Sequence, residues 1–195
     1  MNAIRNVFAL LGLLAVVAVI WGVIKMQPYY SAFQSFDDKA LATYQDMAET
    51  LLASGNAAEA TIWKRQVKDG LSVDDVEEVM KSVANELNIK DVGRLPLSQQ
   101  VELMTGQKQR FLKIYMYCNP LTAAKMVDYS DAFSAYLPCR LSLVEDKQGK
   151  YWIYSLNMDM MIHGGKPLPP DLKVEAERVR TVIKSIMDRA ASGEF

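Results

Sequence analysis

The chain has 195 residues, half of them hydrophobic, and its 22 basic and 23 acidic side chains leave a formal charge of −1 at pH 7. Arg5 and Lys25 are the only charged residues before Met26, so 20 basic and 23 acidic side chains remain beyond it. This balance excludes a basic stripe, and we expect no nucleic-acid partner. About 170 residues follow the apolar N-terminal segment, enough for one domain with its own core.

Residues 6–24 form an uncharged run of 19 residues after a short tail, residues 1–5. At about 1.5 Å per residue, such a helix spans the hydrocarbon core of a bilayer. A cleaved secretory signal is the alternative, but it expects about 7–15 apolar residues and a small-x-small site directly afterwards. Bulky residues, from Lys25 to Tyr30, follow instead. We therefore predict a transmembrane anchor over residues 6–24, with the lipid bilayer as its partner.

The orientation of this anchor follows from its flanking charges. Arg5 and the α-amino group precede the apolar run, and only Lys25 closely follows it. The positive-inside rule then leaves the N-terminus in the cytoplasm, by a margin of about one charge. The expected location is the inner (cytoplasmic) membrane, crossed once, with the C-terminal domain in the periplasm.

Residues 25–58 are expected to form a juxtamembrane helical segment. Ser35 has the form of a helix cap, with Asp37 and Asp38 in the first turn. Apolar residues then recur on one helical face until Ser54 and the glycine after it. We predict that this helix begins at Ser35.

Strands and helices are expected to alternate from residue 59 onward. The strongest strand signal is Phe111–Cys118, in which Lys113 is the only charged residue, so this strand should lie inside a sheet. A hairpin after two helical crossovers predicts an α+β fold, with a small mixed sheet and helices packed on one face. The predicted strands lie at 61–67, 89–96, 111–118, 139–144 and 150–156, and the predicted helices begin near residues 72, 98, 120 and 171.

Three short motifs occur in order between residues 61 and 157. They are a helix opening at 72–76, Cys118-Asn119-Pro120 at the end of a strand, and Pro138-Cys139-Arg140 at the start of the next. Through these motifs the chain resembles the family known as domain of unknown function 302. The resemblance implies a small α+β fold that pairs into dimers and has no established activity. We place this domain at residues 59–157, outside which residues 158–195 add a Met/His loop and a C-terminal helix. The expected protein partner is a second copy or a membrane complex.

The two cysteines allow at most one intrachain disulfide. Cys118 ends the predicted interior strand and Cys139 begins the next, so their sulfurs approach each other if these strands are neighbours. A structural disulfide, a redox pair, a soft-metal site and a sulfur-carrying site are all compatible with this placement. So are two buried thiols that act as small hydrophobic residues. We expect Cys118 to be the more nucleophilic thiol, because a predicted helix starts directly after it.

A second candidate group is the segment that contains Met158, Met160, Met161 and His163, the only histidine of the chain. Thioether and imidazole ligands suit copper(I), and they can also be axial haem ligands. Alternatively, the methionines pack against the C-terminal helix. Gly164 and the prolines after it predict a loop, in which His163 would be accessible.

No catalytic residue is predicted. A single histidine and the absence of a Gly-x-Ser-x-Gly motif leave no hydrolytic triad to assemble. The leading hypothesis is a non-enzymatic accessory or binding protein, anchored in the membrane, whose ligand or cofactor the sequence does not name. The alternative is a redox or sulfur-handling protein that uses Cys118 and Cys139, or copper or haem binding through residues 158–163.

Overall fold

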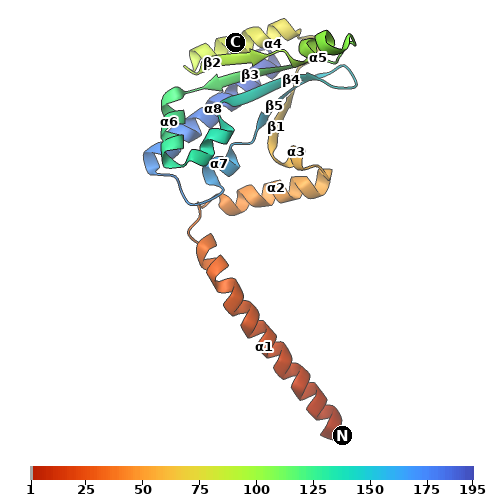
Figure 1. Cartoon of the computed structure of the whole chain (residues 1–195), viewed down its shortest axis with the longest axis vertical. Coiled ribbons are helices and arrows are strands. Elements are labelled where there is room, and N and C mark those ends of the chain that lie inside the picture. The colour runs from red at the N-terminus through yellow and green to blue at the C-terminus, as the bar shows by residue number, and fades with distance from the viewer. Residues whose placement is uncertain (1) are drawn as a thin grey trace.

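The computed structural model describes residues 2–195, with side chains from Arg5 onward. It confirms the α+β class: one long helix projects away from a domain that contains one sheet and several helices (Figure 1). The helices are α1 (Asn2–Phe33), α2 (Ala40–Ser54), α3 (Ala57–Ala60), α4 (Val73–Glu86), α5 (Leu97–Thr105), α6 (Pro120–Tyr129), the 3-10 helix η1 (Asp131–Tyr136), α7 (Asp159–His163) and α8 (Pro170–Ser192). The strands are β1 (Ile62–Gln66), β2 (Lys90–Leu95), β3 (Leu112–Cys118), β4 (Cys139–Glu145) and β5 (Tyr151–Leu156).

The five strands lie in the order β1-β5-β4-β3-β2, and all four pairings are antiparallel. The prediction of a mixed sheet is therefore wrong in its pairing. The crossover through α4 does connect two parallel strands, β1 and β2, but it places them at opposite edges of the sheet. The excursion through α6 returns to the same end of the sheet, which makes β3 and β4 antiparallel neighbours.

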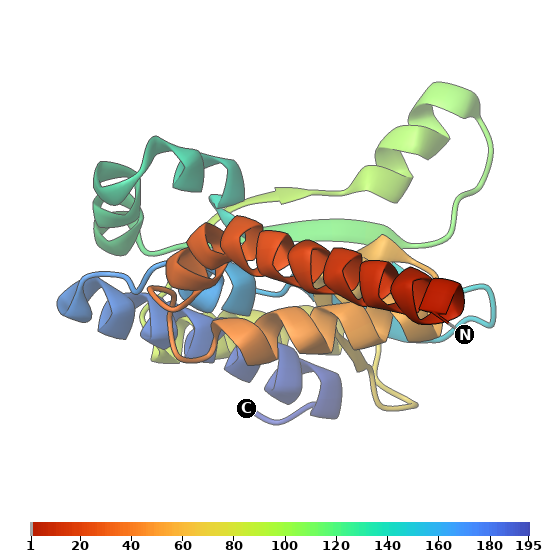
Figure 2. The same cartoon turned by 90° about the horizontal axis from the view of Figure 1, so that it is seen from below.

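Helices α4 and α8 pack against one face of the sheet, as predicted, and Figure 2 shows them on the same side of the strands. Their buried residues recur at helical spacing and meet the strand residues that point to the same face. Burying one Ile or Leu side chain completely stabilises the fold by about 1.5–3 kcal/mol. The fully buried aliphatic residues here include Val79 and Val83 of α4, Leu141, Leu143 and Ile153 of the strands, and Ile183 and Ile186 of α8.

Lys113, the only charged residue of β3, has a specific partner on α4. Its Nζ donates to Oε1 of Glu77 at 2.6 Å, and the Tyr115 hydroxyl donates to the same oxygen at 2.7 Å. Burial alone would raise the pKa of Glu77, but the bonds from Lys113 and Tyr115 lower it below its usual value. The ionised Glu77 therefore ties α4 to the interior of the sheet.

The opposite face of the sheet carries half-buried apolar and aromatic residues. They alternate along the strands with the buried residues, so they point away from α4 and α8. The rings of Trp152 and Tyr154 lie side by side here, with centroids 6.5 Å apart. Other apolar residues of this face are Ile62, Leu112, Ile114, Met116, Val144 and Leu156. The charged Lys64 also lies here, with its Nζ 6.0 Å from the centroid of the Trp152 ring.

Helix α1 is long and apolar enough to span a membrane over Arg5–Phe33, and none of the apolar part is buried against the domain. Its C-terminal end corrects the prediction for the next helix. The Ser35 hydroxyl donates to the carbonyl of Ala32 at the end of α1, and α2 begins only at Ala40. The cap prediction was wrong because Ser35 bonds back to α1. Asp37 bonds to His163 and Lys173, which lie far away in the sequence, as well as to the N–H of Lys39.

Candidate functional site

The pairing of β3 with β4 brings the two cysteines to the same end of the sheet. Tyr117 is the register partner of Cys139, so Cys118 lies one position away on the neighbouring strand. Asn119 then starts α6, because its side-chain Oδ1 accepts from the backbone N–H groups of Leu121 and Thr122. Helices α6 and η1 form an excursion that leaves the sheet beside Cys118 and returns at Cys139.

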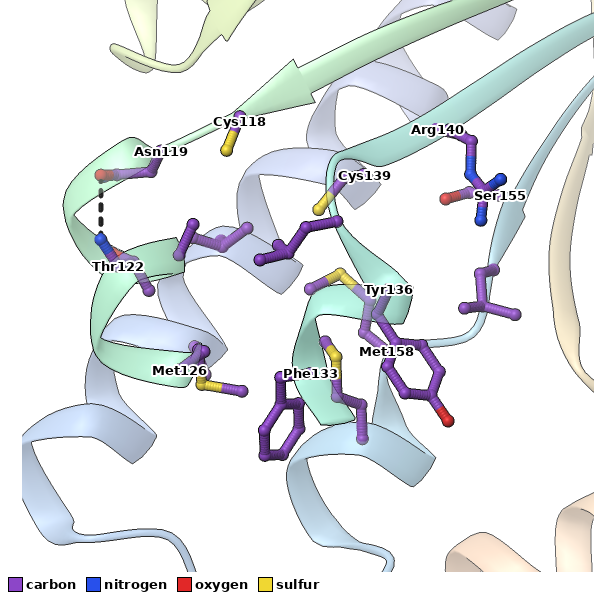
Figure 3. Close-up of a pocket in the computed structure, with 16 residues that line it drawn as sticks. Cys118, Asn119, Thr122, Met126, Phe133, Tyr136, Cys139, Arg140, Ser155 and Met158 are labelled. Carbon is purple, nitrogen blue, oxygen red and sulfur yellow. Dashed lines mark hydrogen bonds between the residues drawn. The ribbon is translucent and has the colours of Figure 1, made fainter. Parts of the chain in front are cut away.

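This excursion encloses a pocket together with α7 and α8 (Figure 3). The cavity volume is about 50 Å³, whereas one ordered water needs about 10–15 Å³. It therefore admits a group of a few atoms. Ala176 and Val179 of α8 form one wall, and Phe133 and Tyr136 of η1 form another.

Both cysteines line this pocket and are free thiols. Burial raises the pKa of the Cys118 thiol. Burial, and next the charge of Cys118, raise the pKa of Cys139 to about 11. Burial thus opposes the expected activation of Cys118 by the start of α6, and the expectation that Cys118 is the more nucleophilic of the two thiols stays a prediction. The side chain of Asn119 already accepts the first free N–H groups of this helix, while burial disfavours the thiolate.

The methionines of the second candidate group are divided between two places. Met158 is buried, and both Met158 and Met161 line the pocket with the cysteines. Met160 lies on another side of α7 and is 36% exposed. Met126 of α6, which the sequence analysis did not single out, also lines the pocket. The structure thus places the cysteine pair and two of the predicted methionines, Met158 and Met161, around one pocket, although the sequence treated them as separate groups.

His163 is not accessible, contrary to the prediction, because it ends the short helix α7 and is only 2% exposed. Its Nδ1 lies 3.1 Å from Oδ1 of Asp37, and its Nε2 lies 3.7 Å from Oε1 of Glu177. Both ring nitrogens therefore face carboxylates rather than a cavity. Glu177 stands where a catalytic nucleophile or a metal would have to approach Nε2.

Asp37 is the centre of this second cluster, which we call the anchor joint: Asp37, His163 and Lys173. The second carboxylate oxygen of Asp37 accepts from Nζ of Lys173, and its first also accepts from the backbone N–H of Lys39. Burial alone would raise the pKa of Asp37, but the hydrogen bonds from Lys173 and Lys39 outweigh burial and hold this pKa well below its usual range. The joint therefore fixes the chain just after α1 to both α7 and α8.

The residues of the family motif occupy structural positions around the pocket. Asn119 and Pro120 begin α6, and Pro138 immediately precedes β4. Arg140 is exposed, and it is the only charged residue among those that line the pocket. Within residues 5–195, no three histidine, cysteine, aspartate or glutamate side chains gather as a metal-binding set. Methionine sulfurs are the additional donors at the pocket.

Comparisons with known proteins identify the fold but not the ligand. The family model described as "Domain of unknown function DUF302" matches residues 63–190. This match includes residues 158–190, which the sequence analysis placed outside the resemblance, and it fits the packing of α8 on the sheet. The crystal structure of an uncharacterized conserved protein DUF302 from Bacillus stearothermophilus has a TM-score of 0.54 at 16% identity, over 67% of this chain and 98% of that one. At this identity the likeness shows the fold alone. No curated protein matches the chain significantly.

The anchor joint yields a stability prediction. Asp37→Ala leaves His163 and Lys173 without their shared carboxylate, and breaking a buried pair on one side costs about 3 kcal/mol in the free energy of unfolding. Asp38→Ala is the matched control: the Asp38 side chain is 82% exposed and lies 3.9 Å from Nζ of Lys173, and loss of such an exposed ion pair costs at most about 1 kcal/mol. Thermal unfolding of both variants, followed by circular dichroism, measures this difference.

The contribution of Asp37 to stability should also depend on pH. Because the pKa of Asp37 is lowered by folding, its stabilisation is complete above the ordinary carboxyl value of about 3.9 and is lost as the pH falls further. The gap in stability between the wild type and Asp37→Ala should be constant from about pH 5 upward and should narrow below about pH 4. Equal stability of the Asp37 and Asp38 variants at neutral pH would contradict the role of the joint.

Proposed function

The chain belongs to the DUF302 family of domains of unknown function, so we propose its role from the geometry of the site. The protein is a membrane-anchored, non-enzymatic binding protein, and its small-ligand pocket lies between α6, η1, α7 and α8. One observation carries this proposal. The pocket is lined mainly by apolar and sulfur-containing side chains, and two of the polar groups at its edge already have partners. Thr122 donates to Glu175, and Asn119 caps α6. Such a site holds a ligand without offering an acid–base pair.

A redox or sulfur-handling role for Cys118 and Cys139 is the second candidate. Their positions on neighbouring strand ends favour it. Thiol exchange needs a thiolate, however, and a pKa of about 11 leaves Cys139 protonated near neutral pH. Binding is therefore the better supported role. Haem is not proposed, since a cavity of about 50 Å³ is far smaller than the roughly 300–1,000 Å³ of pockets for larger ligands.

The proposed anchoring rests on α1. This helix is apolar, exposed along its length and separate from the core of the domain (Figure 1). Arg5 and the α-amino group before the apolar run, against Lys25 alone after it, favour a cytoplasmic N-terminus. The pocket would then face the periplasm, close to the inner membrane.

A homodimer is proposed for the open face of the sheet. Trp152, Tyr154, Ile114, Met116 and Val144 form a mixed apolar and aromatic surface there, and such surfaces mark protein interfaces. The resemblance to the family, which implies dimers, favours a second copy as the occupant. A two-fold axis across this face would bring the same residues of both copies together.

Filling the pocket should abolish ligand binding. Ala123 lines the pocket, whereas the neighbouring Ala124 is exposed on the same helix. Native mass spectrometry of protein purified in mild detergent should show a bound small-molecule mass with the wild type and Ala124→Leu, and only the bare chain with Ala123→Leu. The proposal would be contradicted if both variants retained the same amount of bound small molecule, or if the wild type carried no bound mass.

Protease added to intact spheroplasts should digest the domain if it faces the periplasm. The expected result is loss of the C-terminal epitope while a cytoplasmic marker protein stays intact. Protection of the epitope until the membrane is lysed would reverse the proposed orientation.

A charge on the open face should dissociate the dimer. Val144 is half-buried on this face near the end of β4, the middle strand of the sheet, and Val174 of α8 is 66% exposed elsewhere. Light scattering in detergent should report a dimer for the wild type and Val174→Lys, and a monomer for Val144→Lys, which would bury an unpaired charge. A monomeric wild type at tens of micromolar would rule out a specific interface of ordinary affinity, as would a dimeric Val144→Lys variant.

A further inference from the structure

Sulfur is concentrated in the pocket. Five of its sixteen lining residues carry sulfur, which includes both cysteines and three of the 11 methionines of the chain. These five come from different elements: Cys118 from β3, Met126 from α6, Cys139 from β4, Met158 from the turn before α7, and Met161 from α7. A single methionine is ordinary core filling. The convergence of five sulfurs around one cavity calls for a chemical explanation.

The two thiols are arranged as a pair. They lie one register position apart on neighbouring strands and are not joined by a disulfide. Figure 3 shows their sulfurs on the same side of the strand ends, facing the cavity toward Met126 and Met158. A group in the cavity would therefore meet thiols from the sheet on one side and thioethers on the other.

We propose that this pocket binds one soft monovalent metal ion of the copper(I) class, through the sulfurs of Cys118 and Cys139 with thioethers of Met158 and Met161 beside them. The inference rests on the proposed function, since it names the ligand class of the same pocket. Soft thiolate and thioether ligands select copper(I) over harder divalent ions. An ion also fits a cavity of about 50 Å³, where a larger cofactor does not.

The charges at the site balance. When copper(I) enters, each cysteine S–H bond breaks, two Cu–S bonds form, two protons leave to solvent, and no electron is transferred. The resulting dithiolate complex carries a charge of −1. Arg140, the one charged residue of the pocket lining, supplies a compensating positive charge at the edge. Uncompensated charge in an apolar pocket would be strongly unfavourable.

Other metals fit this set of donors less well. Zinc prefers four ligands from cysteine, histidine and carboxylates, but His163 faces Asp37 and Glu177 instead. Calcium and magnesium take oxygen ligands, and no carboxylate lines the pocket among the residues that the structure describes. The predicted copper ligands Met160 and His163 are thus replaced by the pair of cysteines.

The test titrates copper(I) into the reduced, full-length protein in detergent under anaerobic conditions, in competition with the chromogenic chelator bicinchoninate. The wild type should bind one copper(I) per chain, with a coordination shell of sulfur alone by X-ray absorption spectroscopy. Cys118→Ser and Cys139→Ser should each weaken binding by more than tenfold, since loss of even an outer-shell group costs about 10–100-fold. Met158→Leu should weaken it as well, while its matched control Met160→Leu should bind like the wild type.

A second pair of variants leaves every donor in place. Ala123→Leu should block copper(I) by filling the cavity, and Ala124→Leu should not, with circular dichroism confirming that both fold. If the wild type binds no more copper(I) than the double cysteine variant, or prefers zinc, the inference fails. If Ala123→Leu and Ala124→Leu still differ in the small molecule that they retain, the pocket binds a ligand other than copper, and only the copper inference fails. If they do not differ either, both proposals fail.

Discussion

The antiparallel pairing of β3 with β4 is the constraint on which the pocket depends. The register of Tyr117 with Cys139 brings together two cysteines that are 21 positions apart in the chain. The intervening residues cannot cross the sheet, so α6 and η1 fold back at one end and leave a space beyond the strand ends (Figure 3). Helix α8 closes that space with Ala176 and Val179, while Ile183 and Ile186 one and two turns on are fully buried in the core. One wall of the pocket is therefore as rigid as the core itself.

Helix α7 connects this pocket to the end of the long apolar helix α1. It has only five residues, Asp159–His163, and it contributes to both clusters. Met161 faces the pocket, and His163 contacts Asp37 in the anchor joint. The carbonyl of Gly165 accepts from the N–H of Asp37 at 2.8 Å, and the carbonyl of Gly164 accepts from the Tyr44 hydroxyl at 2.6 Å. The point where the chain leaves α1 is thus bonded to the same short segment that supplies two pocket sulfurs.

Local signals in the sequence predicted most of the elements and four of the five pocket sulfurs, but not that these sulfurs share one pocket. The capping box at Ser72 and Asp75 marked the start of α4, because both of its bonds lie within four residues. Asp37 was misread as part of a helix cap, since its partner His163 lies 126 positions away. No local pattern carries that information. The mixed sheet was predicted for a similar reason: a crossover implies parallel strands, but the sequence does not say how many strands lie between them.

The carboxylates and the histidine described above lie outside the pocket, which favours the proposed binding role over acid–base catalysis. Asp37 pairs with Lys173 and contacts His163 in the anchor joint, and Glu77 is bonded to Lys113 and Tyr115. What remains in the pocket is mainly apolar surface and sulfur, with one arginine and the uncharged polar side chains of Asn119, Thr122, Tyr136 and Ser155. A hydrated ion or a charged metabolite would lose its water there without gaining matching partners. A soft ligand loses little hydration and gains polarisable sulfur contacts, so the composition of the walls selects the chemistry of the ligand.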